Sequence, residues 1–287
     1  MKKVIIQGFA GSFHDDVAHR YFHNEEIEPV CASSFHLLGQ RFQEDKEIDF
    51  AVMAIENSIA GTILQNYKII RGQQFSIIGE AYLRIKMNLM AAKDMELSEI
   101  KEVHSHPMAL YQCTQFLKMF PHIKLVESED TALSAKFIAD FQTEGIAAIA
   151  SKRASKLYSL PIIAEGIEDN KANYTRFFVL SKFPQEVESA DKASVWIRIG
   201  HETGSLLQVL SIIANQGVNL SKLQSYPVLG RFSEYAFHMD LEFENVDTYY
   251  KLKEMLQNET KAFQELGIYK RADISAALRK EEVSVML

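Results

Sequence analysis

The sequence predicts an α/β protein with a large first domain and a small second domain. Over residues 1–181, short segments with the composition of strands alternate with amphipathic helical segments. A polar stretch without periodicity, 182–193, follows and is expected to be a linker. Residues 194–273 then show the order strand, helix, strand, strand, helix, strand, which is typical of a ferredoxin-like sandwich, and 274–287 are expected to form a C-terminal tail.

The first unit is a strand, a glycine turn and a helix. Residues 4–6 are apolar, Gly8 and Gly11 follow, and the amphipathic pattern begins after Ser12. Ser12 and Asp15 have the spacing of a capping box, which favours a helix start here. Such a turn can direct backbone N–H groups at an anion, although a plain strand-to-helix connection is the more common case.

The second unit carries a polar cluster at the end of a strand. A helix is expected over residues 34–45 and a buried strand over 49–55, after which a new helix begins near residue 63. In open α/β sheets, ligands bind at the carboxyl ends of strands. A helix cap needs one polar residue, so a cluster of several favours a binding site. The cluster consists of Glu56, Asn57, Ser58, Gly61 and Thr62.

The rest of the large domain repeats the alternation. Strands are expected at 75–78, 81–90, 123–126, 147–150 and 161–164, and helices at 107–120, 130–140 and 152–158. His104 and His106 lack a third ligand at a suitable spacing, so a metal site is not expected. His106 instead precedes Pro107, which suits a first helical turn, and we expect it to face a cleft.

The domain ends in a strand at residues 173–180. Aromatic and β-branched residues dominate it, yet Thr175 and Arg176 stand side by side at its start. The segment alone is equally compatible with a solvated edge strand and with a functional pair.

Composition excludes several classes of protein. Hydrophobic residues make up 47% of the chain and charged residues 24%, and the net charge of -7 argues against nucleic-acid binding. Two cysteines form no disulfide framework, which fits a reducing compartment. The first apolar run is too short for a signal peptide, and no apolar segment reaches the ~20 residues that span a bilayer. We therefore expect a cytoplasmic protein without membrane association.

Several of these segments together resemble one family, the prephenate dehydratases. Residues 8–13 resemble its glycine turn, 56–61 its E-N-S-x-x-G motif, 105–110 its S-H-P-x-A-L segment and 173–177 its N-x-T-R-F signature. The second domain resembles an ACT domain, with 204–207 and 219–227 matching its two effector motifs. The motifs occur in the family's order and cover nearly the whole chain.

The resemblance implies a bilobal catalytic domain similar to a type II periplasmic binding protein, with the active site between its lobes. It also implies conversion of prephenate to phenylpyruvate, with loss of water and carbon dioxide, in phenylalanine biosynthesis, without a metal or organic cofactor. We expect Thr175 to hydrogen-bond the departing hydroxyl and Arg176 to bind a substrate carboxylate. The expected catalytic residues are Thr175, Arg176, Phe177, Glu56 and Asn57, and the expected substrate-binding residues are Ser12, Phe13, Ser58, Gly61, Thr62, His106 and Asn173.

The ACT resemblance implies L-phenylalanine as an allosteric inhibitor, bound between paired domains of a dimer or tetramer. The family's second effector motif usually reads E-S-R-P, whereas this chain has Gln224-Ser225-Tyr226-Pro227. The expected effector-binding residues are Gly204, Ser205, Leu206, Leu207, Asn219, Leu220, Gln224 and Ser225.

Three other interpretations stay open. Arogenate dehydratase uses a substrate with an amino acid side chain, and the motifs do not separate it from prephenate dehydratase. A bilobal binding protein with an ACT sensor would lack catalysis, but the presence of both Thr175 and Arg176 speaks against it. A purely regulatory ACT protein would leave about two thirds of the chain without a role.

Overall fold

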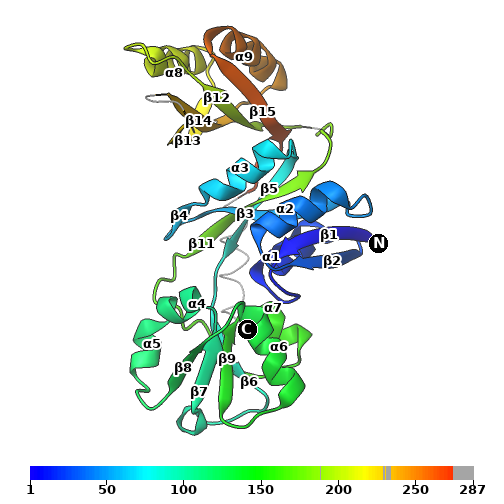
Figure 1. Cartoon of the computed structure of the whole chain (residues 1–287), viewed down its shortest axis with the longest axis vertical. Helices are drawn as coiled ribbons and strands as arrows, with labels where there is room; N and C mark the ends of the chain where they lie inside the picture. The colour runs from blue at the N-terminus through cyan, green and yellow to red at the C-terminus, as the bar shows by residue number, and fades with distance from the viewer. Residues whose placement is uncertain (188, 229, 231–233, 274–287) are drawn as a thin grey trace. The chain divides into compact units, whose positions relative to one another are not determined.

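The computed structural model describes residues 1–187, 189–228, 230 and 234–273. The chain divides into two compact units. One comprises residues 1–69 and 81–177, and the other comprises 70–80 together with the chain from 178 onward. Each unit is an α/β structure, and the fold class is the one that the sequence predicts (Figure 1).

The first sheet has the strand order β2-β1-β3-β11-β5, with the short β4 beside β3. Residues 76–80 of β5 and 178–181 of β11 are counted with the smaller unit. Strand β1 runs parallel to β2 and to β3, which requires helical crossovers between them. The elements are β1 (Lys2–Gln7), α1 (Phe13–Tyr21), β2 (Ile27–Ala32), α2 (Phe35–Glu44), β3 (Phe50–Asn57), β4 (Gly61–Thr62), α3 (Leu64–Gly72), β5 (Ser76–Arg84) and β11 (Tyr174–Ser181).

The second sheet has the order β10-β6-β9-β7-β8 and mixes parallel and antiparallel pairs. Small side chains on β9, such as Ala148 and Ala150, let α6 pack closely against the sheet. The elements are β6 (Asn88–Ala91), η1 (Leu97–Glu99), β7 (Glu102–Ser105), α4 (Pro107–Gln112), α5 (Thr114–Lys118), β8 (Lys124–Glu127), α6 (Thr131–Phe141), β9 (Ile146–Ala150), α7 (Lys152–Leu157) and β10 (Ile162–Ala164).

The smaller unit contains a four-stranded antiparallel sheet with the order β13-β14-β12-β15. Together with the βαββαβ sequence of elements, this is the ferredoxin-like topology that the sequence predicts. Its core packs Val195, Ile197 and Met239 of the sheet against Val209 and Leu252 of the two helices. The elements are β12 (Lys192–Arg198), α8 (Ser205–Asn215), β13 (Asn219–Pro227), β14 (Tyr235–Glu242), α9 (Val246–Glu259) and β15 (Ala262–Tyr269).

Three boundaries differ from the expectation. The strands expected at 75–78 and 81–90 are β5, which continues through Gly79, and β6, which begins only at Asn88. The single helix expected over 107–120 is two short helices, because Asp169 bonds at the break: its N–H donates to Gln112 O and its Oδ1 accepts from Gln115 N. The expected linker ends early, since β12 already begins at Lys192.

Two expected features reach beyond the described part of the chain. The turn between β13 and β14 includes Gly230, which has φ +76°, but Leu229 and Arg231 lie outside the described residues. The expected tail, 274–287, lies outside them as well. In the part of the chain that the structure describes, no helix is long and apolar enough to cross a membrane.

Candidate active site

A cavity of about 410 Å³ in the larger unit is lined by residues from both of its sheets. Strand ends and helix starts meet there, as expected at the carboxyl edges of parallel strands. Among the expected site residues, it is lined by Ser12, Phe13, Asn57, His106, Asn173, Thr175 and Phe177. The other lining residues include Gln7, His14, Met87, Gln112, Glu129, Asp130 and Thr131.

The side chain of Asn57 determines how the Thr175 hydroxyl takes part in hydrogen bonding. Its Oδ1 accepts the N–H groups of Ile59 and Ala60, each at 2.9 Å, so the amide orientation is determined. Its Nδ2 therefore donates to Thr175 Oγ1 at 2.9 Å. Because that oxygen accepts, the hydroxyl keeps its own proton for a partner in the cavity, and the accepted hydrogen bond polarises it.

Asn173 extends this chain of amides. Its Oδ1 accepts from Asn57 Nδ2 at 2.7 Å, and its Nδ2 donates to Gln112 Oε1 at 3.1 Å. Asn173 is 1% exposed, so these partners satisfy polar atoms that water does not reach. Asn57, Asn173, Gln112 and Thr175 thus form one oriented network along the cavity.

The start of α1 contributes backbone donors, though not those that the glycine turn suggests. Gly8 N–H bonds to Ala32 O, Gly11 N–H to Asp15 Oδ2, and Ser12 N–H to Phe9 O. These three N–H groups of the turn are therefore already paired within the protein. The N–H groups of Phe13 and His14, in the first turn of a nine-residue helix, have no acceptor among the described residues. These two groups are the ones available to an anion.

His14 is held in its neutral form beside Phe177. Burial lowers the pKa of its imidazole to about 3, and the two ring centroids lie 5.0 Å apart, edge to face. Its Nε2 accepts the Ala54 N–H at 3.2 Å, so the proton resides on Nδ1. His14 therefore lines the cavity without carrying a charge.

Two N-cap residues, His106 and Asp130, also line the cavity. Nδ1 of His106 accepts from Met108 N at 3.2 Å, as expected for a helix-start residue, and leaves Nε2 as a donor. Oδ1 of Asp130 accepts from the N–H groups of Ala132 and Leu133. Burial raises the pKa of the Asp130 carboxyl, and a Cβ placed on Gly8 would lie 2.6 Å from its Oδ2.

Arg176 occupies the other face of β11. Thr175 and Phe177 line the cavity and Arg176 does not, as the two-residue period of a strand requires. The Arg176 side chain is 4% exposed; its Nη1 lies 4.0 Å from Glu56 Oε2, and its guanidinium carbon lies 5.9 Å from the centre of the Tyr82 ring. This placement differs from the direct carboxylate contact expected of Arg176, and Glu56 likewise does not line the cavity.

Ser58, Gly61 and Thr62 lie near Asn57 but do not line the cavity. Ser58 holds β11 in place: its Oγ donates to Ala172 O and accepts from Tyr174 N. Gly61 and Thr62 form β4 and pair with the end of β3. Their role in substrate binding stays a prediction.

In the smaller unit, the expected effector residues gather at the start of α8 and along β13. Gly204 takes φ +89° as the N-cap of α8, a conformation that favours glycine. Leu206 and Leu220 pack on the core, whereas Leu207 is 68% exposed. Asn219 Nδ2 donates to Glu242 Oε2 at 3.2 Å. Ser205 Oγ donates to Glu202 O, and Gln224 Nε2 donates to Ser225 O.

Tyr226, which stands where the family motif usually has arginine, has a local partner. Its ring stacks on His238 with centroids 5.2 Å apart, and its hydroxyl lies 3.2 Å from His238 Nε2. Burial lowers the pKa of His238 to about 3. The aromatic side chain thus packs against the sheet, where an arginine would place a charge.

No group of three potential metal ligands occurs in the described ranges. His104, considered above as a ligand, bonds instead to Glu102 Oε2 at 3.0 Å.

Several lining residues were not singled out by the sequence analysis, and three of them, His14, Gln112 and Asp130, make the hydrogen bonds described above. Gln112 lies two residues beyond the 105–110 segment that contains His106, so its proximity to the cavity could have been inferred. His14 and Asp130 look like an ordinary first-turn residue and an ordinary helix cap. Only the meeting of two sheets shows that they face one cavity.

Comparison with known proteins agrees with this geometry. The family model described as prephenate dehydratase matches residues 4–185. The bifunctional chorismate mutase/prephenate dehydratase of Escherichia coli (strain K12) is 31% identical over 275 residues, which cover 93% of this chain and 70% of that protein.

Solved structures share the fold of the whole chain. Prephenate dehydratase from Arthrobacter aurescens, solved in complex with L-Phe, is 27% identical with a TM-score of 0.80, and the match covers 99% of each chain. GqqA, described as a novel type of quorum quenching acylase, has a TM-score of 0.83 over 96% of this chain and 100% of its own. At 24% identity, that second likeness shows the fold alone. The family model spans more than half of the chain, and the chain belongs to the prephenate dehydratase family.

Proposed function

We propose that Thr175 and its network of amides carry the family's reaction in this chain, the conversion of prephenate to phenylpyruvate with loss of water and carbon dioxide. The observation that carries the proposal is the 2.9 Å hydrogen bond from Asn57 Nδ2 to Thr175 Oγ1. It leaves the hydroxyl with a donor proton in a cavity lined by amides and aromatic rings.

The reaction does not require a strong acid in the active site. As carbon dioxide leaves, the electrons of the broken C–C bond become a ring double bond, and the hydroxyl departs with the electrons of the C–O bond. A proton must join that hydroxide to form water. Threonine is a weak acid, so we assign Thr175 a hydrogen bond that strengthens as negative charge develops on the departing oxygen, with the proton coming ultimately from solvent.

The substrate carboxylates need donors. We assign one carboxylate to the N–H groups of Phe13 and His14 at the start of α1, where the helix dipole adds to the hydrogen bonds. His106 Nε2 is a further donor at the same cavity. Arg176, buried beside Glu56 and Tyr82, is assigned the role of fixing the strand that carries Thr175.

The direct test is incubation of the purified protein with prephenate, followed by absorbance of phenylpyruvate in alkali. Parallel incubation with arogenate, with detection of phenylalanine, separates the related activity. Turnover of arogenate but not of prephenate would show that arogenate is the substrate. Turnover of neither compound would refute catalysis and favour a binding protein with a sensor domain.

We also propose that the smaller unit is an ACT domain that binds L-phenylalanine between paired copies of the chain in the cytoplasm. Its ferredoxin-like topology, the positive φ of Gly204 and the position of Asn219 at the start of β13 support this. The A. aurescens relative was solved with L-Phe. Calorimetric titration with L-phenylalanine should give saturable heat, and light scattering should give at least a dimer. Absence of heat would refute the effector assignment.

A further inference from the structure

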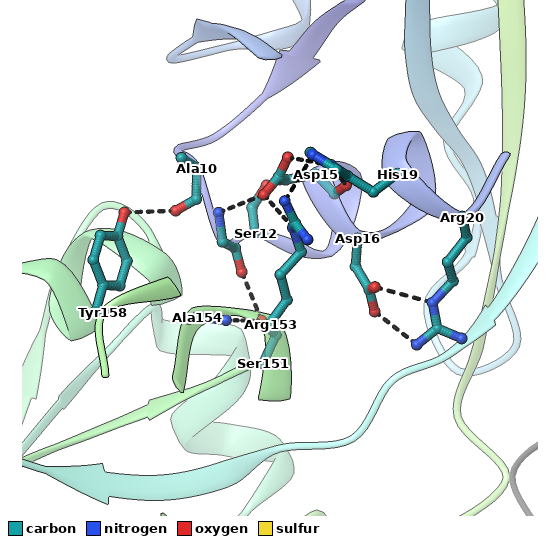
Figure 2. A network of polar contacts seen from close by, with 11 residues as sticks. Ala10, Ser12, Asp15, Asp16, His19, Arg20, Ser151, Arg153, Ala154 and Tyr158 are labelled. Carbon is teal, nitrogen blue, oxygen red and sulfur yellow. Dashed lines mark hydrogen bonds and ion pairs between the residues drawn. The ribbon is translucent and has the colours of Figure 1, made fainter. Parts of the chain in front are cut away.

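We propose that Arg153 of α7 is a positioning residue for substrate binding, acting through Asp15 and His19 on the start of α1. The inference rests on the proposed function, because it assigns the Phe13 and His14 N–H groups to the substrate. Figure 2 shows the contacts: the side chain of Arg153 reaches from α7 to the first turn of α1. Arg153, Asp15 and His19 do not line the cavity themselves, so they act on it through Ser12, Phe13 and His14 at the start of α1, which do.

Asp15 is the centre of the network. Its carboxylate is fully buried, and Oδ2 accepts from Gly11 N at 2.8 Å and from Arg153 Nε at 2.5 Å. A buried carboxylate is costly unless a cation and hydrogen bonds compensate it. Arg153 supplies that charge. Asp15 in turn fixes the peptide of Gly11, which immediately precedes the N-cap Ser12.

His19 orients the guanidinium from the other side. Its Nε2 lies 2.9 Å from Arg153 Nη2, and its Nδ1 lies 3.0 Å from both the backbone oxygen and Oδ1 of Asp15. An arginine nitrogen can only donate, so Nε2 is the acceptor and the proton resides on Nδ1. The ring therefore links Arg153 to Asp15 as a neutral bridge.

Helix α7 and its two cap residues contact the turn at three further places. Ser151 Oγ donates to Gly11 O at 2.6 Å, and Tyr158 Oη donates to Ala10 O at 2.7 Å (Figure 2). A Cβ placed on Gly11 would lie 3.0 Å from Ala154 Cα, so glycine allows the two backbones to approach. These contacts hold the turn even without Arg153, so the loss of Arg153 should leave the protein folded.

The expected consequence is a loss of substrate affinity. Without Arg153, the Asp15 carboxylate must draw in water or a proton, and its bond to Gly11 N–H shifts. The Phe13 and His14 donors lie two and three residues further on. Displacement of such donors by about 1 Å costs up to roughly 100-fold in enzymes that depend on orientation.

The test compares Arg153→Gln, Arg153→Lys and the control Arg20→Gln. Arg20 pairs with Asp16 on the exposed side of the same helix, with both N–O distances 2.9 Å, so its loss removes an arginine–aspartate pair without touching the turn (Figure 2). Steady-state kinetics with prephenate should show KM raised about 10-fold or more in Arg153→Gln, with kcat changed less. Arg153→Lys should recover part of the affinity, and Arg20→Gln should match the parent.

A second comparison separates positioning from general loosening. Asp15→Asn and the double variant Asp15→Asn/Arg153→Gln should raise KM by no more than Arg153→Gln alone, because the two residues act as one unit. Equal KM in the parent and Arg153→Gln would overturn the proposal, as would an equal rise in Arg20→Gln. If Arg153→Gln fails to fold, the KM of Arg153→Lys takes its place: a KM above that of the parent supports the proposal, and a KM equal to that of the parent overturns it. Absence of phenylpyruvate with the parent chain would instead refute the proposed function.

Discussion

The hydroxyl of Thr175 lies at the end of a chain of amide hydrogen bonds that runs from Gln112 through Asn173 and Asn57. Each amide in that chain has a determined orientation, because the Oδ1 of Asn57 is occupied by two backbone donors. The arrangement therefore presents one donor proton to the cavity at a defined place. Preorganised donors of this kind need not reorient as charge develops.

Thr175→Ala should fold normally and lose phenylpyruvate formation by at least ~100-fold, because a single well-placed donor contributes on that scale. Thr175→Ser keeps the hydroxyl and should keep most of the activity. The measurement is product absorbance in alkali, with circular dichroism as the control for folding. Near-parental turnover in the alanine variant would contradict the assignment.

At this scale the sequence predicts which residues gather, but not which way each one faces. Thr175 and Arg176 were expected to share the cavity, yet adjacent residues of a strand point to opposite faces. Knowing which face Arg176 takes requires knowing what packs on each side of β11. The neutral state of His14 could not be predicted either, because it comes from burial against Phe177, a residue far away in the chain.

At the scale of elements, the helix starts define the cavity. The Ser12 cap of α1 was predicted from its spacing to Asp15, and Ser12 Oγ does accept from Asp15 N at 3.3 Å. A full capping box would also have the Asp15 carboxylate accept from the backbone N–H of Ser12. Among the described contacts it accepts from the N–H of Gly11 instead. The local pattern identified the helix start, and Arg153 of α7 draws the Asp15 side chain to a different partner.

Helix α6 places a carboxylate, that of Asp130, at a cavity assigned to a dianionic substrate. Asp130→Asn keeps the N-cap, since asparagine caps as well as aspartate, but removes the charge. We expect a several-fold lower KM for prephenate, on the order of 1 kcal/mol of relieved repulsion. The matched control is Asp140→Asn at the far end of the same helix, where Asp140 pairs with Lys136. A higher KM in Asp130→Asn would mean that the carboxylate binds the substrate.

The buried pair of Lys192 and Glu80 joins β12 to the part of β5 that belongs to the smaller unit. Their side chains are 4% and 1% exposed, with Nζ 3.1 Å from Oε1. Lys192→Met leaves a buried carboxylate without this cation and should lower the free energy of unfolding by about 3–5 kcal/mol. Adding Glu80→Leu should restore part of the loss. Urea titration of both variants measures the change. The control is Lys93→Met at the exposed Lys93–Glu144 pair, which should leave the free energy of unfolding close to that of the parent.

At the scale of the whole molecule, alternation of strand and helix patterns was enough to predict an α/β fold and a ferredoxin-like second unit. It was not enough to predict that Gly79 lies within a continuous strand, or that the chain leaves α4 at Cys113. Both depend on partners distant in sequence, such as Asp169, whose N–H and carboxylate bond on either side of the break.

Two buried histidines, one in each unit, make the stability of the protein depend on pH. Burial lowers the pKa of both His14 and His238 to about 3, whereas in the unfolded chain each titrates near 6.5. Between these values the unfolded state binds more protons, so stability is full above about pH 6.5 and falls as the pH drops toward 3. Each histidine contributes up to about 1.4 kcal/mol per pH unit. Calorimetry from pH 7.5 to 5 should show a falling Tm, with a shallower fall in His238→Gln; equal slopes in the two proteins would show that His238 does not contribute.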